Sequence, residues 1–122
     1  MITGLVVVAG AIGALLRYEV DLAVRRRWAG STPVGILLVN LTGALILGVL
    51  VGAASHHRVD ASVVTVAGTG LLGAYTTFST LSWDTVGLAG TGRSRLAVAN
   101  LALSLALGLG AAALGLFLGQ AV

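Results

Sequence analysis

Four long stretches without a charged residue constrain this chain more than any other feature. They run from Ile2 to Leu16, Val34 to Ala54, Ala61 to Trp83 and Leu96 to Val122. A helix needs about 20 apolar residues to cross the hydrocarbon of a bilayer. The last three stretches reach that length alone, and the first reaches it if its helix continues through Arg17 to Val24. The sequence therefore predicts an all-α integral membrane protein with four transmembrane helices in a single domain, residues 1–122.

Composition agrees with this class. The chain is 57% apolar and 9% charged, whereas typical soluble domains contain roughly 25% charged residues. It has no cysteine, which excludes disulfides and thiolate metal sites. The net charge of +3 comes from arginines in short loops. This pattern indicates membrane topology and contact with anionic lipid, with no nucleic acid as a partner.

A polar cluster interrupts the third stretch. The segment Gly73-Ala-Tyr-Thr-Thr-Phe-Ser-Thr-Leu81 carries four hydroxyl residues, Thr76, Thr77, Ser79 and Thr80. Burying such groups unpaired costs several kcal/mol in an apolar medium, so a cluster at this depth usually faces a partner helix or a solute pathway. In the alternative, each hydroxyl bonds to a carbonyl of its own helix, which is common for one or two Ser or Thr residues.

The third stretch is also longer than a straight crossing requires. With the residues after Trp83 that continue it, the predicted third span has 28 residues from Ala61 to Leu88, and Gly68, Gly70 and Gly73 precede the polar cluster. Excess length together with glycines predicts a helix broken near the midplane, whose freed carbonyls face a protected cavity. Carbonyl oxygens are hard ligands, which suit a cation such as Na⁺.

Two glycine pairs indicate close contacts between helices. Gly48 and Gly52 lie four residues apart in the second stretch, and Gly115 and Gly119 do so in the fourth. Small residues at this spacing allow two helix backbones to approach each other in a membrane.

Asn40 is a further polar residue at depth, within Leu37-Leu-Val-Asn40-Leu-Thr42-Gly43. Its amide carries two N–H donors and one acceptor oxygen, so it can bond to a partner helix or donate to an anion. Spacing alone favours the bond between helices, and the polar cluster in the third stretch strengthens the case for a functional role.

The arginines are distributed unequally between the two sides of the predicted bundle. Arg25, Arg26, Arg27, Arg93 and Arg95 lie in the first and third loops, and Arg58 lies in the second. Five against one predicts a fixed orientation, with the arginine-rich loops cytoplasmic and both termini outside. His56 and His57 in the second loop lack a third ligand at helical spacing, so we expect them to be solvated.

These residues together resemble a known family, the small bacterial fluoride channels (Fluc, or CrcB-type). The matching motifs are Gly10-x-x-Gly13-Ala-x-x-Arg17-Tyr18, Pro33-x-Gly35-x-x-x-x-Asn40-x-x-Gly43 and Gly73-x-x-Thr76-Thr77-Phe78-Ser79-Thr80, followed by Asp84. They cover three of the four predicted spans in the right order. The Thr-Thr-Phe-Ser-Thr string with the upstream asparagine is the specific part.

The resemblance implies a non-enzymatic channel, an antiparallel dimer with two narrow pores. It would conduct fluoride passively out of the cytoplasm across the inner (plasma) membrane, as a multi-pass protein conferring fluoride resistance. The residues implied to form the fluoride pathway are Asn40, Phe78, Ser79, Thr80, Ser104 and Arg17. The backbone carbonyls of Gly73 and Thr76 from both subunits would hold one Na⁺ on the dimer axis.

The chemistry of the anion fits this set of residues. Fluoride is small and strongly hydrated, so a pore must replace its water with amide N–H groups, hydroxyls and the electropositive edge of an aromatic ring. The sequence contains no fixed cation at mid-depth to trap the anion, and no motif for ATP.

Two positions depart from the family pattern. Leu81 stands where the family's string ends in a second Phe, and Ile36 stands where the second motif has a Thr. Some bacteria pair two divergent subunits of this family in opposite orientations. Both departures and the arginine bias are consistent with such a heterodimer, while a homodimer stays open.

Two further functional classes remain possible from the residues. A proton-coupled small multidrug transporter is a four-span chain of similar size, but it requires a carboxylate deep in the first span. Glu19 and Asp21 lie late in that span, beside Arg17. A non-conducting accessory membrane protein would leave the polar cluster of the third stretch without a role.

Overall fold

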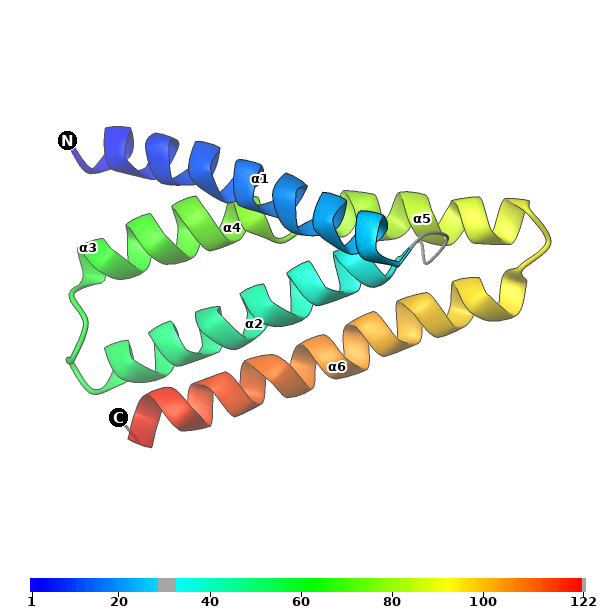
Figure 1. The fold of residues 1–122 in the computed structure, drawn as a ribbon. Helices are drawn as coiled ribbons and strands as arrows, with labels where there is room; N and C mark the ends of the chain where they lie inside the picture. Colours follow the sequence, from blue (N-terminus) through cyan, green and yellow to red (C-terminus); the bar gives the residue numbers. More distant parts are fainter. Residues whose placement is uncertain (29–32, 122) are drawn as a thin grey trace.

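The computed structural model describes residues 1–28 and 33–121, and within these ranges every regular element is a helix. The elements are α1 (Ile2–Arg27), α2 (Val34–Ser55), α3 (Ala61–Val63), the π-helix η1 (Val64–Leu72), α4 (Gly73–Tyr75), α5 (Phe78–Gly90) and α6 (Ser94–Ala121) (Figure 1). The segments α3, η1 and α4 follow one another without a break in helical conformation.

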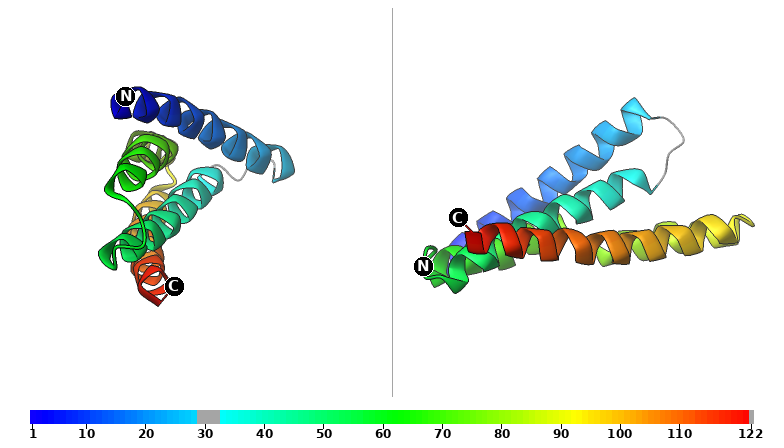
Figure 2. Two further views of the ribbon diagram at one scale, coloured as in Figure 1. Left: turned by 90° about the vertical axis from the view of Figure 1, so that its left-hand side faces the viewer. Right: turned by 90° about the horizontal axis from the view of Figure 1, so that it is seen from below.

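The helices run back and forth along one long axis. Both termini and the connection from α2 to α3 lie at the same end, and the turn from α5 to α6 lies at the other (Figure 1). Viewed from below, the C-terminal end of α1 and the start of α2 diverge from the pair formed by α5 and α6 (Figure 2). Arg25–Arg27 and Arg93–Arg95 therefore lie toward one end of the helix bundle, and Arg58 lies at the other end.

Three helical segments have the length and hydropathy to cross a membrane. They are Val34–Ser55, Ala61–Gly90 and Ser94–Ala121. The first helix, α1, spans 26 residues and continues through Arg17 to Val24, as a fourth span would require. Its second half carries charged groups, among them Asp21, which accepts a bond of 2.8 Å from Nε of Arg25 one turn later.

The glycine pairs lie where α2 packs against α6, which confirms the close contacts that their spacing predicts. All four glycines are buried. A Cβ atom at Gly48 would collide with the carbonyl oxygen of Ala112, and one at Gly115 would collide with the carbonyl oxygen of Leu45. The two backbones can approach this closely only because both surfaces lack side chains there.

The third helical segment leaves helical geometry at two residues. Thr76 has φ −77° and ψ 156°, and Thr77 has φ −151° and ψ 126°, so both are extended. Gly73 is helical, with φ −62° and ψ −35°, so this extended step follows the glycine-rich part by several residues. The preceding π-helix η1 packs on α1, where Gly13 allows the carbonyl of Leu71 to approach.

Candidate functional site

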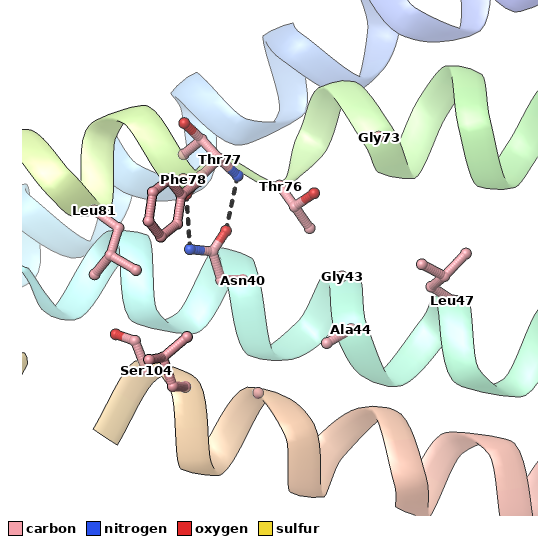
Figure 3. A pocket seen from close by; sticks show the side chains of 12 residues that line it. Asn40, Gly43, Ala44, Leu47, Gly73, Thr76, Thr77, Phe78, Leu81 and Ser104 are labelled. Atoms are coloured by element: carbon pink, nitrogen blue, oxygen red, sulfur yellow. Dashed lines mark hydrogen bonds between the residues drawn. The ribbon is translucent and has the colours of Figure 1, made fainter. Parts of the chain in front are cut away.

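The extended step at Thr76 and Thr77 is held by one amide side chain from α2. Asn40 Nδ2 donates to the carbonyl oxygen of Thr77 at 3.0 Å, and Thr77 N–H donates to Asn40 Oδ1 at 2.9 Å (Figure 3). A helix end leaves backbone groups without intrahelical partners. Asn40 supplies both missing partners to Thr77, so the bond between helices that its spacing favoured is present.

This pairing fixes the orientation of the Asn40 amide and leaves one donor free. Thr77 N–H can only donate, so the amide oxygen must face it and the amide nitrogen must face the Thr77 carbonyl. One N–H of Nδ2 is used in that bond, and the second has no protein partner among the described residues. Asn40 can therefore brace the step and still donate to an anion.

The neighbouring residues of α2 complete the contact with the step. Gly43 is buried, and a Cβ atom there would collide with Cγ2 of Thr76. Thr42 Oγ1 lies 3.0 Å from the hydroxyl of Tyr75, the last residue of α4. Because the Thr42 hydroxyl also donates to the Leu38 carbonyl at 2.8 Å, Tyr75 is the donor in the bond between the two side chains.

The hydroxyls of the polar cluster divide into two groups. Thr76 Oγ1 donates to the Leu72 carbonyl at 3.0 Å, which is the bond to its own helix considered above. Thr77 Oγ1 instead caps α5 by accepting from Thr80 N–H at 3.3 Å. The Thr77 oxygen also lies 3.1 Å from Ser79 Oγ and 3.2 Å from Thr80 Oγ1. Three hydroxyls thus form a connected group at the start of α5.

A cavity of about 450 Å³ opens beside the step, between α2, the third segment and α6. Figure 3 shows Phe78 and Leu81 on one side of it and Ser104 on the other, with Asn40 between them. Ser104 is 7% exposed, and within the described chain its Oγ has no hydrogen-bond partner. The cavity therefore offers an unpaired hydroxyl, a free amide N–H and an aromatic ring.

The structure brings together five of the eight residues that the sequence predicts for the site. Those lining the cavity are Asn40, Phe78, Ser104, Gly73 and Thr76. Ser79 and Thr80 lie in the first turn of α5, where they contact the Thr77 hydroxyl, and they do not line the cavity. Arg17 lies on α1, with no ion pair or hydrogen bond to a described residue.

The two positions that depart from the family pattern have different environments. Leu81 is 4% exposed and lines the cavity, so a change there alters its wall. Ile36 is 2% exposed and does not line this cavity.

The sequence argument missed the role of Thr77, which lines the cavity, and it missed the buried Asn100 near Ser104. Thr77 appeared only as one hydroxyl among four, although its backbone makes both bonds to Asn40. Asn100 is buried one turn before Ser104, and its Nδ2 donates to Thr85 Oγ1 at 2.8 Å. An asparagine within the apolar fourth stretch, four residues from Ser104, was the available signal.

The extended step also leaves backbone carbonyls free to hold a cation. In the described chain, no backbone or side-chain group donates a hydrogen bond to the carbonyls of Gly73 or Thr76. Thr77 N–H, which would bond to the Gly73 carbonyl in a continuous α-helix, is taken by Asn40. The described residues contain no group of His, Cys, Asp or Glu side chains arranged to hold a metal.

Comparison with known proteins gives a consistent result. The family described as CrcB-like protein, Camphor Resistance (CrcB), matches residues 4–116. A protein of Frankia casuarinae named fluoride-specific ion channel FluC 1 is 45% identical over 123 residues, covering 97% of this chain and 95% of that protein. The FluC 1 of Streptomyces avermitilis is 45% identical over 119 residues, with 97% and 96% covered. The FluC 2 of Mycobacterium tuberculosis is 44% identical over 115 residues, with 94% and 88% covered.

Proposed function

We infer that this chain, which belongs to the CrcB-like family, is a fluoride-specific ion channel subunit and not an enzyme. Family membership extends over nearly the whole chain, and relatives at about 45% identity carry this name. The structural observation that carries the inference is the free N–H of Asn40 at a cavity that Phe78 and Ser104 also line. All three groups present positive edges or donors to an anion.

The site suits passive conduction of a small anion. A dehydrated fluoride ion needs donors in place of its water, and it must be able to leave again. The Asn40 N–H is pre-oriented because its amide is tied to Thr77 on both sides. Among the described residues, no arginine lines the cavity, so none of them places a fixed positive charge beside the anion there.

The geometry does not favour the proton-coupled alternative. That mechanism requires a carboxylate at the substrate site, and no Asp or Glu is among the described residues that line the cavity. Glu19 is exposed on α1. The relatives' names point to the fluoride channel as well.

In a bilayer, we propose that α1 joins the three long apolar segments as a fourth span and that the extended step lies near the midplane. The carboxylate of Asp21 is paired with Arg25. This pairing lowers the free-energy cost of placing the charged second half of α1 near the membrane–water interface. We propose that the protein lies in the plasma membrane, where a channel can release fluoride from the cytoplasm to the outside of the cell.

For the assembly, we propose an antiparallel dimer that is either a homodimer or a heterodimer with a homologous subunit. The Phe78 ring is 68% exposed beside the cavity, which suits a ring that a second subunit covers. The arginine bias and Leu81 favour a partner of different sequence, because a partner in the opposite orientation could supply the absent aromatic ring.

We further propose that Gly73 and Thr76 hold Na⁺ through their backbone carbonyls. The residues fit this ion, since both carbonyls lack hydrogen bonds from any described residue and hard oxygen ligands suit it. When bound, Na⁺ would supply positive charge and cross-link the carbonyls around it.

Fluoride release from liposomes tests the function directly. Purified protein, reconstituted alone and with a homologous partner, should release fluoride down its gradient without a proton gradient and should retain chloride. Equal release of both halides, or release that requires a pH difference, would contradict a fluoride-specific channel.

A further inference from the structure

Three residues of α2 dock the end of α4 and the extended step. Asn40 bonds to the backbone of Thr77, Thr42 accepts from the hydroxyl of Tyr75, and Gly43 lies against Thr76. Asn40 and Gly43 are three residues apart and share one face of α2, which meets the step, while Thr42 lies between them in the sequence and contacts the end of α4. Asn40, Thr42 and Gly43 together form the docking surface.

The step depends on the docking surface for its backbone hydrogen bonds. Thr77 N–H donates to Asn40 Oδ1, and the Thr77 carbonyl accepts from Asn40 Nδ2. Unpaired backbone groups are costly in a membrane. Separation of the step from α2 would therefore leave Thr77 N–H without its partner and would remove one bond from the Thr77 carbonyl.

Gly43 sets the distance at which this pairing is possible. The bonds of 3.0 and 2.9 Å join a short side chain to a backbone, so they require close approach of α2. Gly43 permits that approach because it has no Cβ, and one built there would collide with Cγ2 of Thr76. The collision partner belongs to the residue directly before Thr77 in the chain.

Of the two carbonyls assigned above to Na⁺, that of Thr76 belongs to the step and that of Gly73 lies three residues before it. Thr77 N–H is bound to Asn40 and so does not occupy the Gly73 carbonyl. A bond from Thr77 N–H to the Gly73 carbonyl would reform an α-helical turn. That bond would occupy a carbonyl assigned to the cation, and Asn40 Oδ1 would lose its donor at the same time. Docking of the step and exposure of the carbonyls are thus one structural state.

We propose that Asn40 and Gly43 are positioning residues that couple the cation carbonyls to the anion donor through the docked step. The inference rests on the proposed function and deepens it. Na⁺ at the Gly73 and Thr76 carbonyls stabilises the docked state, and in that state the Asn40 amide is oriented with its free N–H at the cavity. By linkage, a change that weakens docking must lower the affinity for Na⁺.

Amide hydrogen exchange at Thr77 tests this coupling without relying on conduction. The full-length protein in detergent is titrated with Na⁺, using N-methyl-D-glucamine to keep ionic strength constant, and exchange is followed for residues 76–78. Gly43→Ala is compared with Gly110→Ala, a matched change on α6 where a built Cβ meets nothing within 4 Å. Tyr75→Phe is a milder variant, which removes one docking bond and adds no atoms.

We expect Na⁺ to slow exchange at Thr77 in the natural sequence and in Gly110→Ala at the same concentration. Overpacking at Gly43 should raise the Na⁺ concentration for half-maximal protection about tenfold. Loss of the Tyr75 hydroxyl should raise it about threefold, as one hydrogen bond would. The coupling would be overturned if all four proteins needed the same Na⁺ concentration for half-maximal protection. It would also be overturned if the exchange rate at Thr77 did not depend on Na⁺.

The result separates this inference from the proposed function. If the protein releases no fluoride but shows the expected exchange pattern, the channel proposal fails and the coupling stands. If fluoride is released while Na⁺ has no effect on Thr77, the channel proposal stands and the coupling fails.

Discussion

At the scale of single residues, Asn40 combines two roles in one amide. Its oxygen and one N–H bond to the backbone of Thr77, and its second N–H remains available to an anion. Ser104 differs, since its buried Oγ has no partner in the described chain. A bonded donor is fixed in direction, whereas a free hydroxyl can turn toward a passing ion.

Asn40→Ala should lower fluoride flux strongly. The change removes the donor at the cavity and also releases Thr77. A hydrogen bond to a charged group contributes about 1.5–3 kcal/mol, which corresponds to a loss of about tenfold or more. Thr65→Val is the control, because the Thr65 hydroxyl is exposed and donates to Ala61 in its own helix. Fluoride efflux from liposomes is measured for both variants. Unchanged efflux in Asn40→Ala would show that Asn40 is not part of the fluoride pathway.

Ser104→Ala should affect stability and conduction in opposite directions. Removing a buried hydroxyl without a partner should leave the unfolding temperature unchanged or raise it, by the equivalent of about 1 kcal/mol or less. The same change should reduce fluoride efflux, because the cavity loses a donor. Ser82→Ala serves as the comparison, since its hydroxyl donates to Phe78 at 2.9 Å. A clear fall in the unfolding temperature would show that Ser104 is bonded.

At the scale of elements, close packing of helices sets the form of the cavity. Gly48 and Gly52 of α2 and Gly115 and Gly119 of α6 bring these two helices together, and Gly43 brings α2 to the extended step. Each contact is a place where a backbone meets a backbone or a short side chain. The geometry of the site therefore depends on residues that carry no functional group themselves.

Gly48→Ala should destabilise the fold, and Gly87→Ala should have little effect on packing. A Cβ at Gly48 would collide with the Ala112 carbonyl, while at Gly87 it would meet nothing within 4 Å. Overpacking of this kind costs about 1–3 kcal/mol. Thermal unfolding in detergent compares the two variants. Equal unfolding temperatures would mean that α2 and α6 can separate slightly without loss.

At the scale of the whole molecule, the ends of the bundle differ in charge. Arg25–Arg27 form the C-terminal end of α1, and Arg93 and Arg95 flank the first residue of α6. Arg58 lies in the connection from α2 to α3, which is at the opposite end (Figure 1). A bias of five to one predicts insertion in one orientation. An antiparallel dimer needs both orientations, which is why a homologous partner is proposed.

We expect this chain alone to restore fluoride resistance poorly in a host that lacks its own exporter. Co-expression with an oppositely inserted homologue should restore growth, because the partner would supply the second orientation and an aromatic ring near Leu81. Reporter tags on the C-terminus measure orientation in the same cells. Full resistance from the single chain, with tags on both sides of the membrane, would establish a dual-topology homodimer instead.

The sequence by itself determined the membrane class, the family and the residues of the polar cluster. Apolar length, charge-free stretches and a specific string are local properties, so no tertiary information is needed to read them. The glycine pairs predicted close helix contacts, which the α2–α6 interface confirms.

Only the tertiary structure decided how those residues combine. Spacing along α2 could not show that Asn40 binds the Thr77 backbone, because the partner lies 37 residues away in the sequence. Nor could it place the extended step, since local propensity made the glycines the natural position, whereas Gly73 is helical and Thr76 and Thr77 are extended. The physical reason is that an extended backbone at this depth persists only where another helix supplies its hydrogen bonds, and that helix is known only once the chain is folded.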